Sequence, residues 1–179
     1  LPTAIGGAPF SGRTRDVTTQ RDPLRFRRNL ERLGEVLAYE VSKSLIYRKT
    51  DVQTSLGVAR TFRLDEPPVL ATVLRAGLPF HQGFLNVFDR SECAFVGAYR
   101  GPHLEGHDFE VQLNYLSSPS LTGKTLVIID PMLATGKSLE TSYRALLRFG
   151  IPARTHVVAA LAAPEGIAHL KARMPECRL

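Results

Sequence analysis

The chain has 179 residues, of which 44% are hydrophobic and 22% charged, a composition typical of a globular domain with a buried core. No apolar run approaches the roughly 20 residues of a membrane-spanning helix, and the first residues lack the basic-then-apolar pattern of a secretory signal. Cys93 and Cys177 show no metal-finger spacing, which favours free thiols in a reducing, cytoplasmic setting.

The charge balance is basic, with 23 Lys and Arg against 17 Asp and Glu and a formal net charge of +6. This excess favours an anionic partner. Many arginines gather near the N-terminus, namely Arg13, Arg15, Arg21, Arg25, Arg27, Arg28 and Arg32. No aromatic residues interleave with them in an RNA-stacking pattern. A solvated helix face is therefore favoured over a nucleic-acid interface, and nucleic acid is not expected as a partner.

The N-terminal part is predicted to be an arm followed by a helix. Residues 1–21 are rich in Gly, Ser, Thr and Arg, which predicts an irregular arm. Asp22 is predicted to be the N-cap of the helix and Pro23 its first residue. Apolar residues then recur three or four apart on one face that faces the core, namely Phe26, Leu30, Leu33, Leu37, Val41 and Leu45.

The rest of the chain alternates between short apolar strands and helical stretches. A hairpin is predicted over residues 51–64, around Ser55-Leu56-Gly57, and Pro67-Pro68 ends it. The predicted strands are 69–74, 94–99, 109–115, 125–129 and 157–162, and the predicted helices are 79–88, 137–149 and 165–173. This rhythm predicts an α/β fold, with a mostly parallel sheet flanked by helices in one domain over residues 1–179. Ligands of such sheets bind beyond the carboxyl ends of strands, which directs attention to the loops after residues 74, 100 and 129.

The strongest functional signal is the segment TLVIIDPMLATGKS, where an apolar strand runs into Asp130 and a turn at 134–138 precedes a helix. Backbone N–H groups at a helix N-terminus attract anions, and Gly136 allows close approach. Thr135 and Ser138 add hydroxyl donors. Asp130 can accept hydrogen bonds from a ligand's hydroxyl groups. The segment therefore predicts a phosphate site beside a site for a hydroxylated ligand.

Two kinds of phosphate loop compete for this segment. Gly136-Lys137-Ser138 matches the end of the nucleotide-binding P-loop, G-x-x-x-x-G-K-[ST]. The first glycine of that motif would fall at Pro131, which has no N–H and a fixed φ. The segment DPMLATGKS resembles instead the sugar-phosphate loop of uracil phosphoribosyltransferases, members of the type I phosphoribosyltransferase family. It departs from that family at Lys137, where the family has Gly or another residue.

Further segments carry the same resemblance, which runs in ordered blocks from about residue 69 to 174. Leu74-Arg75-Ala76-Gly77 resembles the segment with which the family binds the pyrophosphate of its activated sugar. Gly97-Ala98-Tyr99-Arg100 resembles a second pyrophosphate contact that leads into a flexible hood loop, here 101–108. Pro164-Glu165-Gly166 matches a third segment, expected to open the last helix.

The resemblance implies a phosphoribosyltransferase-type, Rossmann-like fold and transfer of a phosphoribosyl group from phosphoribosyl pyrophosphate to uracil, giving UMP and pyrophosphate. The implied catalytic residues are Asp130, Arg75 and Arg100. The implied residues for binding phosphoribosyl pyrophosphate are Arg75, Arg100, Asp130, Pro131, Met132, Leu133, Ala134, Thr135, Gly136, Lys137 and Ser138. It also implies substrate-bridged Mg²⁺ with no dedicated metal ligands, a homo-oligomer, GTP binding and a cytoplasmic location.

Three points stay open in the sequence. The family continues with a segment resembling YIVPGLGDAGD that recognises the pyrimidine, and this sequence ends at Leu179 before it, so no uracil-binding residue is assigned. His103 and His107 lie near Glu105 and Asp108, but their loop setting favours loop polarity over a metal site. The alternatives in function are an RNA-binding regulator on the same fold and, less favoured, a P-loop nucleotide hydrolase.

Overall fold

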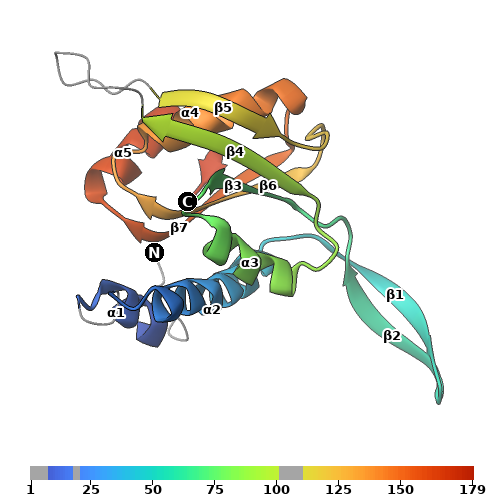
Figure 1. Cartoon of the computed structure of the whole chain (residues 1–179). Coiled ribbons are helices and arrows are strands. Elements are labelled where there is room, and N and C mark those ends of the chain that lie inside the picture. The colour runs from blue at the N-terminus through green and yellow to red at the C-terminus, as the bar shows by residue number, and fades with distance from the viewer. Residues whose placement is uncertain (1–7, 18–20, 101–110) are drawn as a thin grey trace, which may run out of the picture.

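The computed structural model describes residues 8–17, 21–100 and 111–179. Its centre is a six-stranded sheet of order β5-β4-β3-β6-β7-β8 (Figure 1). The strands are β3 (Val69–Leu74), β4 (Cys93–Arg100), β5 (Val111–Ser117), β6 (Thr125–Leu133), β7 (Arg154–Ala162) and β8 (Cys177–Arg178). Neighbouring strands are parallel except for β4 and β5. The predicted mostly parallel sheet is confirmed, and the two-residue β8 is an addition that the sequence did not indicate.

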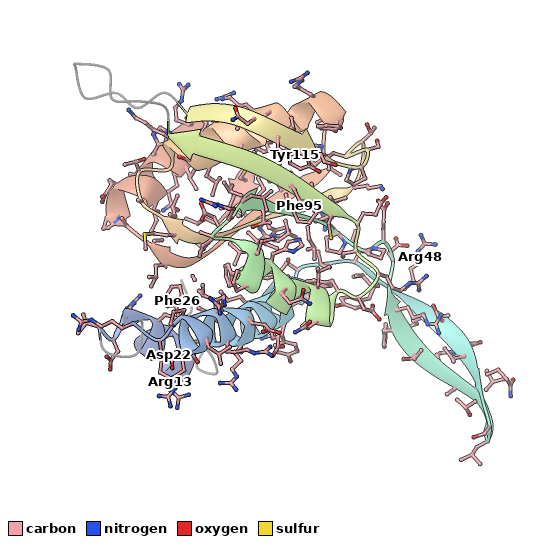
Figure 2. The ribbon with its side chains drawn as sticks, in the orientation of Figure 1. Arg13, Asp22, Phe26, Arg48, Phe95 and Tyr115 are labelled. Carbon is pink, nitrogen blue, oxygen red and sulfur yellow. The ribbon has the colours of Figure 1, made fainter. Side chains whose placement is uncertain are left out.

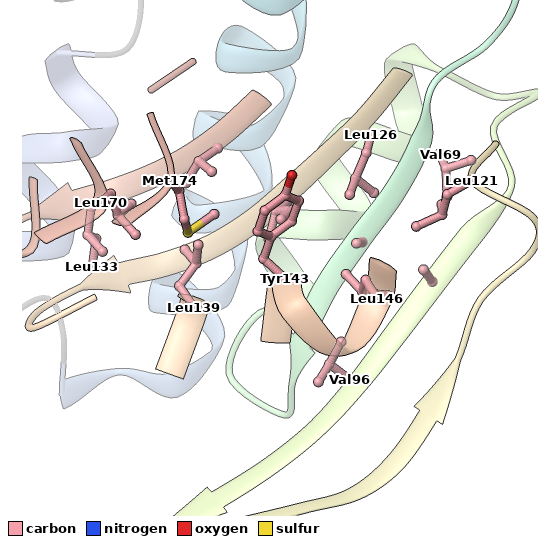
Figure 3. Packing of buried hydrophobic residues seen from close by; sticks show 14 residues of the cluster. Val69, Val96, Leu121, Leu126, Leu133, Leu139, Tyr143, Leu146, Leu170 and Met174 are labelled. Carbon is pink, nitrogen blue, oxygen red and sulfur yellow. The ribbon is translucent and has the colours of Figure 1, made fainter. Parts of the chain in front are cut away.

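Helices cover both faces of the sheet. On one face lie α2 (Pro23–Ser42) and α3 (Leu78–Val87), and on the other α4 (Lys137–Leu146), the 3₁₀ turn Leu147–Phe149 and α5 (Pro164–Arg173). Successive residues of β6 alternate between the two cores, because strand side chains point to opposite faces. Val127 and Ile129 pack with residues of α2 and α3, whereas Ile128 and Leu126, which is labelled in Figure 3, pack with residues of α4 and α5.

The long helix α2 begins as the sequence predicts. The Asp22 carboxylate accepts hydrogen bonds from the backbone N–H groups of Leu24 (3.0 Å) and Arg25 (3.1 Å), so it caps the helix end shown in Figure 2. Leu30 and Leu33 of the apolar stripe are buried. The helix ends at Ser42, so Leu45 packs against the core from beyond the helix.

The prediction of an irregular arm over residues 1–21 is wrong for residues 8–15, which form the helix α1 (Ala8–Arg15). Its composition is unfavourable for a helix, since Gly12 and Ser11 lie in its middle. The helix packs against α2, and Thr14 is buried there. Tertiary contacts of this kind stabilise short helices that would not persist alone, and composition does not reveal them.

The predicted hairpin is confirmed and is longer than expected. It consists of β1 (Tyr47–Thr54) and β2 (Gly57–Leu64), paired from Thr54↔Gly57 at the tip to Tyr47↔Leu64 at the base. The hairpin projects from the body of the molecule (Figure 1). Its apolar side chains are exposed, with Leu56 at 98% and Phe62 at 64%.

The strand predicted over residues 109–115 is observed as β5 (Val111–Ser117), but its side chains do not alternate regularly between core and solvent. Phe109 lies outside the described residues. Gly97 pairs with Tyr115, and Ala98 pairs with Leu113, so Asn114 is an extra, bulged residue. A bulge of one residue reverses the face on which the following side chains lie. Leu113 and Leu116 therefore both pack on the core, whereas Tyr115 is 53% exposed (Figure 2).

The two cysteines lie in different strands of the sheet, Cys93 in β4 and Cys177 in β8. Cys93 and Cys177 are free thiols, and burial raises the pKa of the Cys177 thiol to about 11. The predicted hood loop at 101–108 lies outside the described residues. Within the described part of the chain, no helix is both long and apolar enough to cross a membrane.

Candidate active site

The predicted site lies where β3 and β6 run side by side. Thr72 pairs with Ile129, and the Thr72 hydroxyl donates a 2.9 Å hydrogen bond to the Ile129 carbonyl. Beyond these residues the chain leaves β3 for α3 on one face and leaves β6 for α4 on the other. Such a point of divergence at the carboxyl ends of parallel strands is the usual place for a ligand in an open α/β sheet.

Asp130 lies within β6, because this strand continues to Leu133 and does not end at 129. It pairs with Ala159 of β7, and Leu133 pairs with Ala162. The backbone N–H of Met132 donates a 3.2 Å hydrogen bond to Asp130 Oδ1. Burial raises the pKa of the Asp130 carboxyl, and the bond from Met132 partly opposes that rise. The predicted site therefore contains a partly buried carboxylate that one backbone N–H helps to orient.

The predicted phosphate loop follows directly. Ala134 and Thr135 are exposed, and Gly136 is buried with a φ of +81°, in the left-handed region that favours glycine. Gly136 is also the N-cap of α4, and among the described residues no side chain caps that helix end. A helix start of this kind presents backbone N–H groups and the positive end of the helix dipole to an anion.

The predicted pyrophosphate segment occupies the loop between β3 and α3. Arg75 and Ala76 are exposed, and the Leu74–Arg75 peptide bond is cis. Gly77 is buried, and a Cβ on it would lie 2.0 Å from the Thr72 hydroxyl oxygen. Only glycine fits there, since the Thr72 hydroxyl is held by its bond to the Ile129 carbonyl. The turn that presents Arg75 is thus attached to the junction of β3 and β6.

Arg100 is the last residue of β4, and its backbone pairs with Val111 of β5. Because β4 runs parallel to β3 with Leu74 opposite Gly97, Arg100 extends past the end of β3 at the same edge of the sheet. The structure therefore brings the backbones of all three predicted segments together at the carboxyl ends of the parallel strands β3, β4 and β6. The placement of His103 and His107 lies outside the described residues.

Residues of α5 and α4 contact the phosphate loop, and two of them, His169 and Glu140, were not singled out from the sequence. A Cβ on Gly166 would lie 2.3 Å from the Ala134 carbonyl oxygen, so α5 approaches the loop closely. The ring of His169 lies beside Gly136 and contacts the Glu140 carboxylate, with 2.7 Å between Nε2 and Oε2. The only sequence signal was the Pro164-Glu165-Gly166 segment, because His169 and Glu140 lie 29 residues apart.

A shallow depression lies beside the pyrophosphate segment, between the first turns of α2 and α3. Its lining residues are Leu24, Arg27, Arg28, Glu31, Leu78, Pro79 and Gln82. None of the residues predicted to bind the sugar phosphate lines it. Arg28 is already paired with Glu31 at 2.7 Å. The depression therefore does not coincide with the predicted site.

A metal cage is not part of the described structure. In residues 8–17, 21–100 and 111–179, no group of three His, Cys, Asp or Glu side chains is arranged to hold a metal ion. Asp130, near the carboxyl end of β6, supplies a carboxylate beside the loop. Such an oxygen suits Mg²⁺, which is usually held by one or two carboxylates together with substrate phosphates and water.

Comparison with known proteins places these features in a family. The model of the uracil phosphoribosyltransferase family matches residues 11–179. A uracil phosphoribosyltransferase of Porphyromonas gingivalis is 49% identical over 162 residues, which cover 90% of this chain and 74% of that protein.

Two solved structures are similar in fold. The AQ2163 protein of Aquifex aeolicus has a TM-score of 0.86 and 31% identity, covering 98% of this chain and 82% of its own. A hypoxanthine phosphoribosyltransferase of Staphylococcus aureus has a TM-score of 0.55 and 18% identity, covering 77% and 65% of the two chains, a likeness of fold alone. The phosphoribosyltransferase-type fold predicted from the sequence is confirmed.

Proposed function

Because the chain belongs to the uracil phosphoribosyltransferase family, we propose that it transfers the phosphoribosyl group of phosphoribosyl pyrophosphate to uracil, giving UMP and pyrophosphate. The observation that supports the site is the β6–loop–α4 unit. It combines a desolvated carboxylate at Asp130 with an uncapped helix start at Gly136, next to the turn that carries Arg75. These groups suit a sugar that carries both hydroxyls and phosphates.

In the proposed reaction, the bond from the anomeric carbon to pyrophosphate breaks early and leaves positive charge on the sugar. A new bond forms from that carbon to N1 of uracil, and the N1 proton passes to water or to the departing pyrophosphate. Arg75 and Arg100 hold the leaving pyrophosphate through charge-assisted hydrogen bonds. Residues 134–138 hold the 5′-phosphate, and Asp130 accepts hydrogen bonds from the ribose hydroxyls. Its negative charge stabilises the positive charge that develops on the sugar.

Mg²⁺ is proposed to reach the site with the pyrophosphate. The single carboxylate of Asp130 fits a cation that keeps most of its ligands from substrate and water. When bound, the cation would neutralise charge on the leaving pyrophosphate. The residues of this chain then position the 5′-phosphate and the pyrophosphate of the sugar substrate relative to uracil.

Self-association is proposed as well. The exposed apolar residues of the projecting hairpin, such as Leu56 and Phe62, support it, because a second subunit that covered them would bury apolar surface. Light scattering after size exclusion would measure the assembly. GTP binding and a cytoplasmic location, implied by the family resemblance, stay predictions.

The test of the function is UMP formation by the protein expressed from its complete gene. We expect turnover with uracil, phosphoribosyl pyrophosphate and Mg²⁺, and none when hypoxanthine, guanine or adenine replaces uracil. Turnover of a purine base without turnover of uracil would contradict the proposed substrate. Absence of binding to phosphoribosyl pyrophosphate, measured by calorimetry, would contradict the assignment of the site itself.

A further inference from the structure

The carboxylate of Glu140, in the first turn of α4, collects three partners from two helices. His169 Nε2 lies 2.7 Å from Glu140 Oε2, and Arg173 Nε donates to Oε1 at 3.1 Å, both from α5. Arg144 Nε, one turn along α4, donates to Oε1 at 2.9 Å. The Glu140 side chain is 12% exposed. Burial alone raises its pKa, but the bonds from Arg144, His169 and Arg173 outweigh this, and the pKa of Glu140 lies below its usual value.

Glu140 is also tied directly to the phosphate loop. Its backbone N–H donates a 2.9 Å hydrogen bond to the carbonyl of Gly136, the residue with left-handed φ at the start of α4. The same residue therefore holds Gly136 through its backbone and α5 through its side chain. A shift of α5 relative to α4 would be transmitted to the loop through this connection.

The start of α5 packs directly against residues 133–136. The Ala163 N–H donates to the Leu133 carbonyl at 2.8 Å. A Cβ on Gly136 would lie 3.0 Å from His169 Cδ2, and a Cβ on Gly166 would lie 2.3 Å from the Ala134 carbonyl oxygen. These contacts restrain the loop on its protein side, whereas Ala134 and Thr135 remain exposed on the other.

The core beneath the loop supports the same unit. Leu133 at the end of β6, Leu139 of α4, and Leu170 and Met174 of α5 are each at most 3% exposed and pack together (Figure 3). Apolar packing of this kind fixes the distance between the helices but is weakly directional. The hydrogen bond from His169 to Glu140 is directional, so it orients the imidazole ring beside Gly136.

We propose that Glu140 and His169 are positioning residues that hold the loop 134–138 in the conformation that binds the 5′-phosphate of the sugar substrate. The inference rests on the function proposed for that loop. The imidazole ring fills the space beside Gly136, and the Glu140 carboxylate orients the ring. A loop that is already ordered loses less conformational freedom when the phosphate binds, so both residues lower the dissociation constant without touching the ligand.

The test uses ribose 5-phosphate as a probe of the loop alone, with its dissociation constant measured by calorimetry. Replacing His169 with Phe keeps a ring but removes the bond to Glu140. Replacing it with Gln keeps a nitrogen donor near the position of Nε2. We expect His169→Phe and Glu140→Ala each to weaken ribose 5-phosphate binding by about 10-fold to 100-fold, as small misplacements at a binding site do. His169→Gln should retain most of the affinity.

The kinetic readout separates positioning from general stability. In His169→Phe, the KM for phosphoribosyl pyrophosphate should rise while the KM for uracil stays within about twofold, because only the loop is displaced. Arg173→Gln is the matched control. It also loses a bond to Glu140, but its side chain is 59% exposed and makes no contact with the loop among the interactions of the described residues. It should leave ribose 5-phosphate binding unchanged.

Two results would overturn the inference, and they are distinguishable. If the His169 and Glu140 variants melt at lower temperature but bind ribose 5-phosphate as the wild type does, the network only stabilises the fold. If the wild type itself does not bind ribose 5-phosphate, the function proposed for the loop fails, and the inference fails with it. Should His169→Phe not fold, Glu140→Ala provides the comparison, because it removes the same bond and leaves the imidazole ring in place.

Discussion

At the scale of a single residue, Asp130 is a proposed catalytic group whose burial lowers the stability of the folded protein. Burial raises the pKa of its carboxyl, and among the described residues the Met132 N–H is the hydrogen bond that opposes this rise. A raised pKa in the folded state means that ionised Asp130 costs stability at neutral pH. The proposed reaction needs that negative charge near the sugar.

We expect Asp130→Asn to lower kcat by about 100-fold, the usual effect of removing one charge-stabilising group. The variant should melt at a higher temperature than the wild type at neutral pH, because Asn still accepts from Met132 but carries no charge. As the pH falls through the raised pKa, folded Asp130 binds a proton, and below about 3.9 the unfolded chain binds one too. The difference in melting temperature between the variant and the wild type should then vanish. Turnover and thermal melts across pH measure both effects, and unchanged turnover would refute the role.

Gly136 provides a second prediction for a single residue. Its φ of +81° is strained for any residue with a Cβ, and that Cβ would lie 3.0 Å from His169 Cδ2. Gly136→Ala should therefore lower the free energy of unfolding by about 1–2 kcal/mol and raise the KM for phosphoribosyl pyrophosphate.

The control for that prediction is Gly123→Ala. Gly123 has a φ of +74°, and nothing lies within 4 Å of its ideal Cβ, so the backbone strain is similar and the close approach is absent. Gly123 lies before β6 and outside the loop. Its variant should lose stability in denaturant melts but keep the KM. An equal rise of KM in both variants would show that the loop geometry is not responsible.

At the scale of elements, the crossing of α2 and α3 depends on two glycines. A Cβ on Gly34 would lie 2.4 Å from the Phe80 carbonyl oxygen, and one on Gly83 would lie 2.0 Å from the Glu31 carbonyl oxygen. Because these obstacles are backbone atoms, the helices would have to move apart. The turn that carries Arg75 leads into α3, so this crossing also sets the position of the predicted pyrophosphate segment.

Gly83→Ala should lower the free energy of unfolding by about 2–3 kcal/mol, the upper range for overpacking. Urea melts measure this, with Gln82→Ala as the control, since Gln82 is the exposed neighbour on the same helix. The control should stay within about 0.5 kcal/mol of wild type. A similar stability for both variants would mean that the helices can separate at little cost.

Element types were largely predictable where local patterns agree with burial. The apolar run 69–74 and the Asp22-Pro23 helix start appear in the structure as predicted. The helix α1 and the bulge at Asn114 were not predictable, because each depends on a partner distant in sequence. Distance along the sequence also explains why one part of the proposed site could be predicted and another could not. The proposed phosphate loop, residues 130–138, is contiguous and could be proposed from the sequence, whereas His169 meets Glu140 only after α4 and α5 have packed.

At the scale of the whole molecule, the strand order could not be read from the sequence. Alternation of strands and helices predicts a parallel sheet, but the placement of β3 between β4 and β6 follows from crossovers on opposite faces. That order creates the divergence of loops at which the site lies. It also gives the sheet two cores, one on each face, and the strands β3, β6 and β7 contribute residues to both of them.

The shared strands predict that both cores unfold together, as the expected single domain requires. Leu146 of α4 and Phe84 of α3 are fully buried on opposite faces. Leu146→Ala and Phe84→Ala should each lower the free energy of unfolding by about 2–5 kcal/mol. Because β6 contributes alternate residues to both cores, unfolding of the helices on one face would also disrupt the core on the other face.

Calorimetry should then show one endotherm in each variant, with equal calorimetric and van't Hoff enthalpies. A second endotherm, shifted only by the variant on its own face, would show two independent units. Scans at several protein concentrations separate this outcome from subunit dissociation, which makes the midpoint depend on concentration.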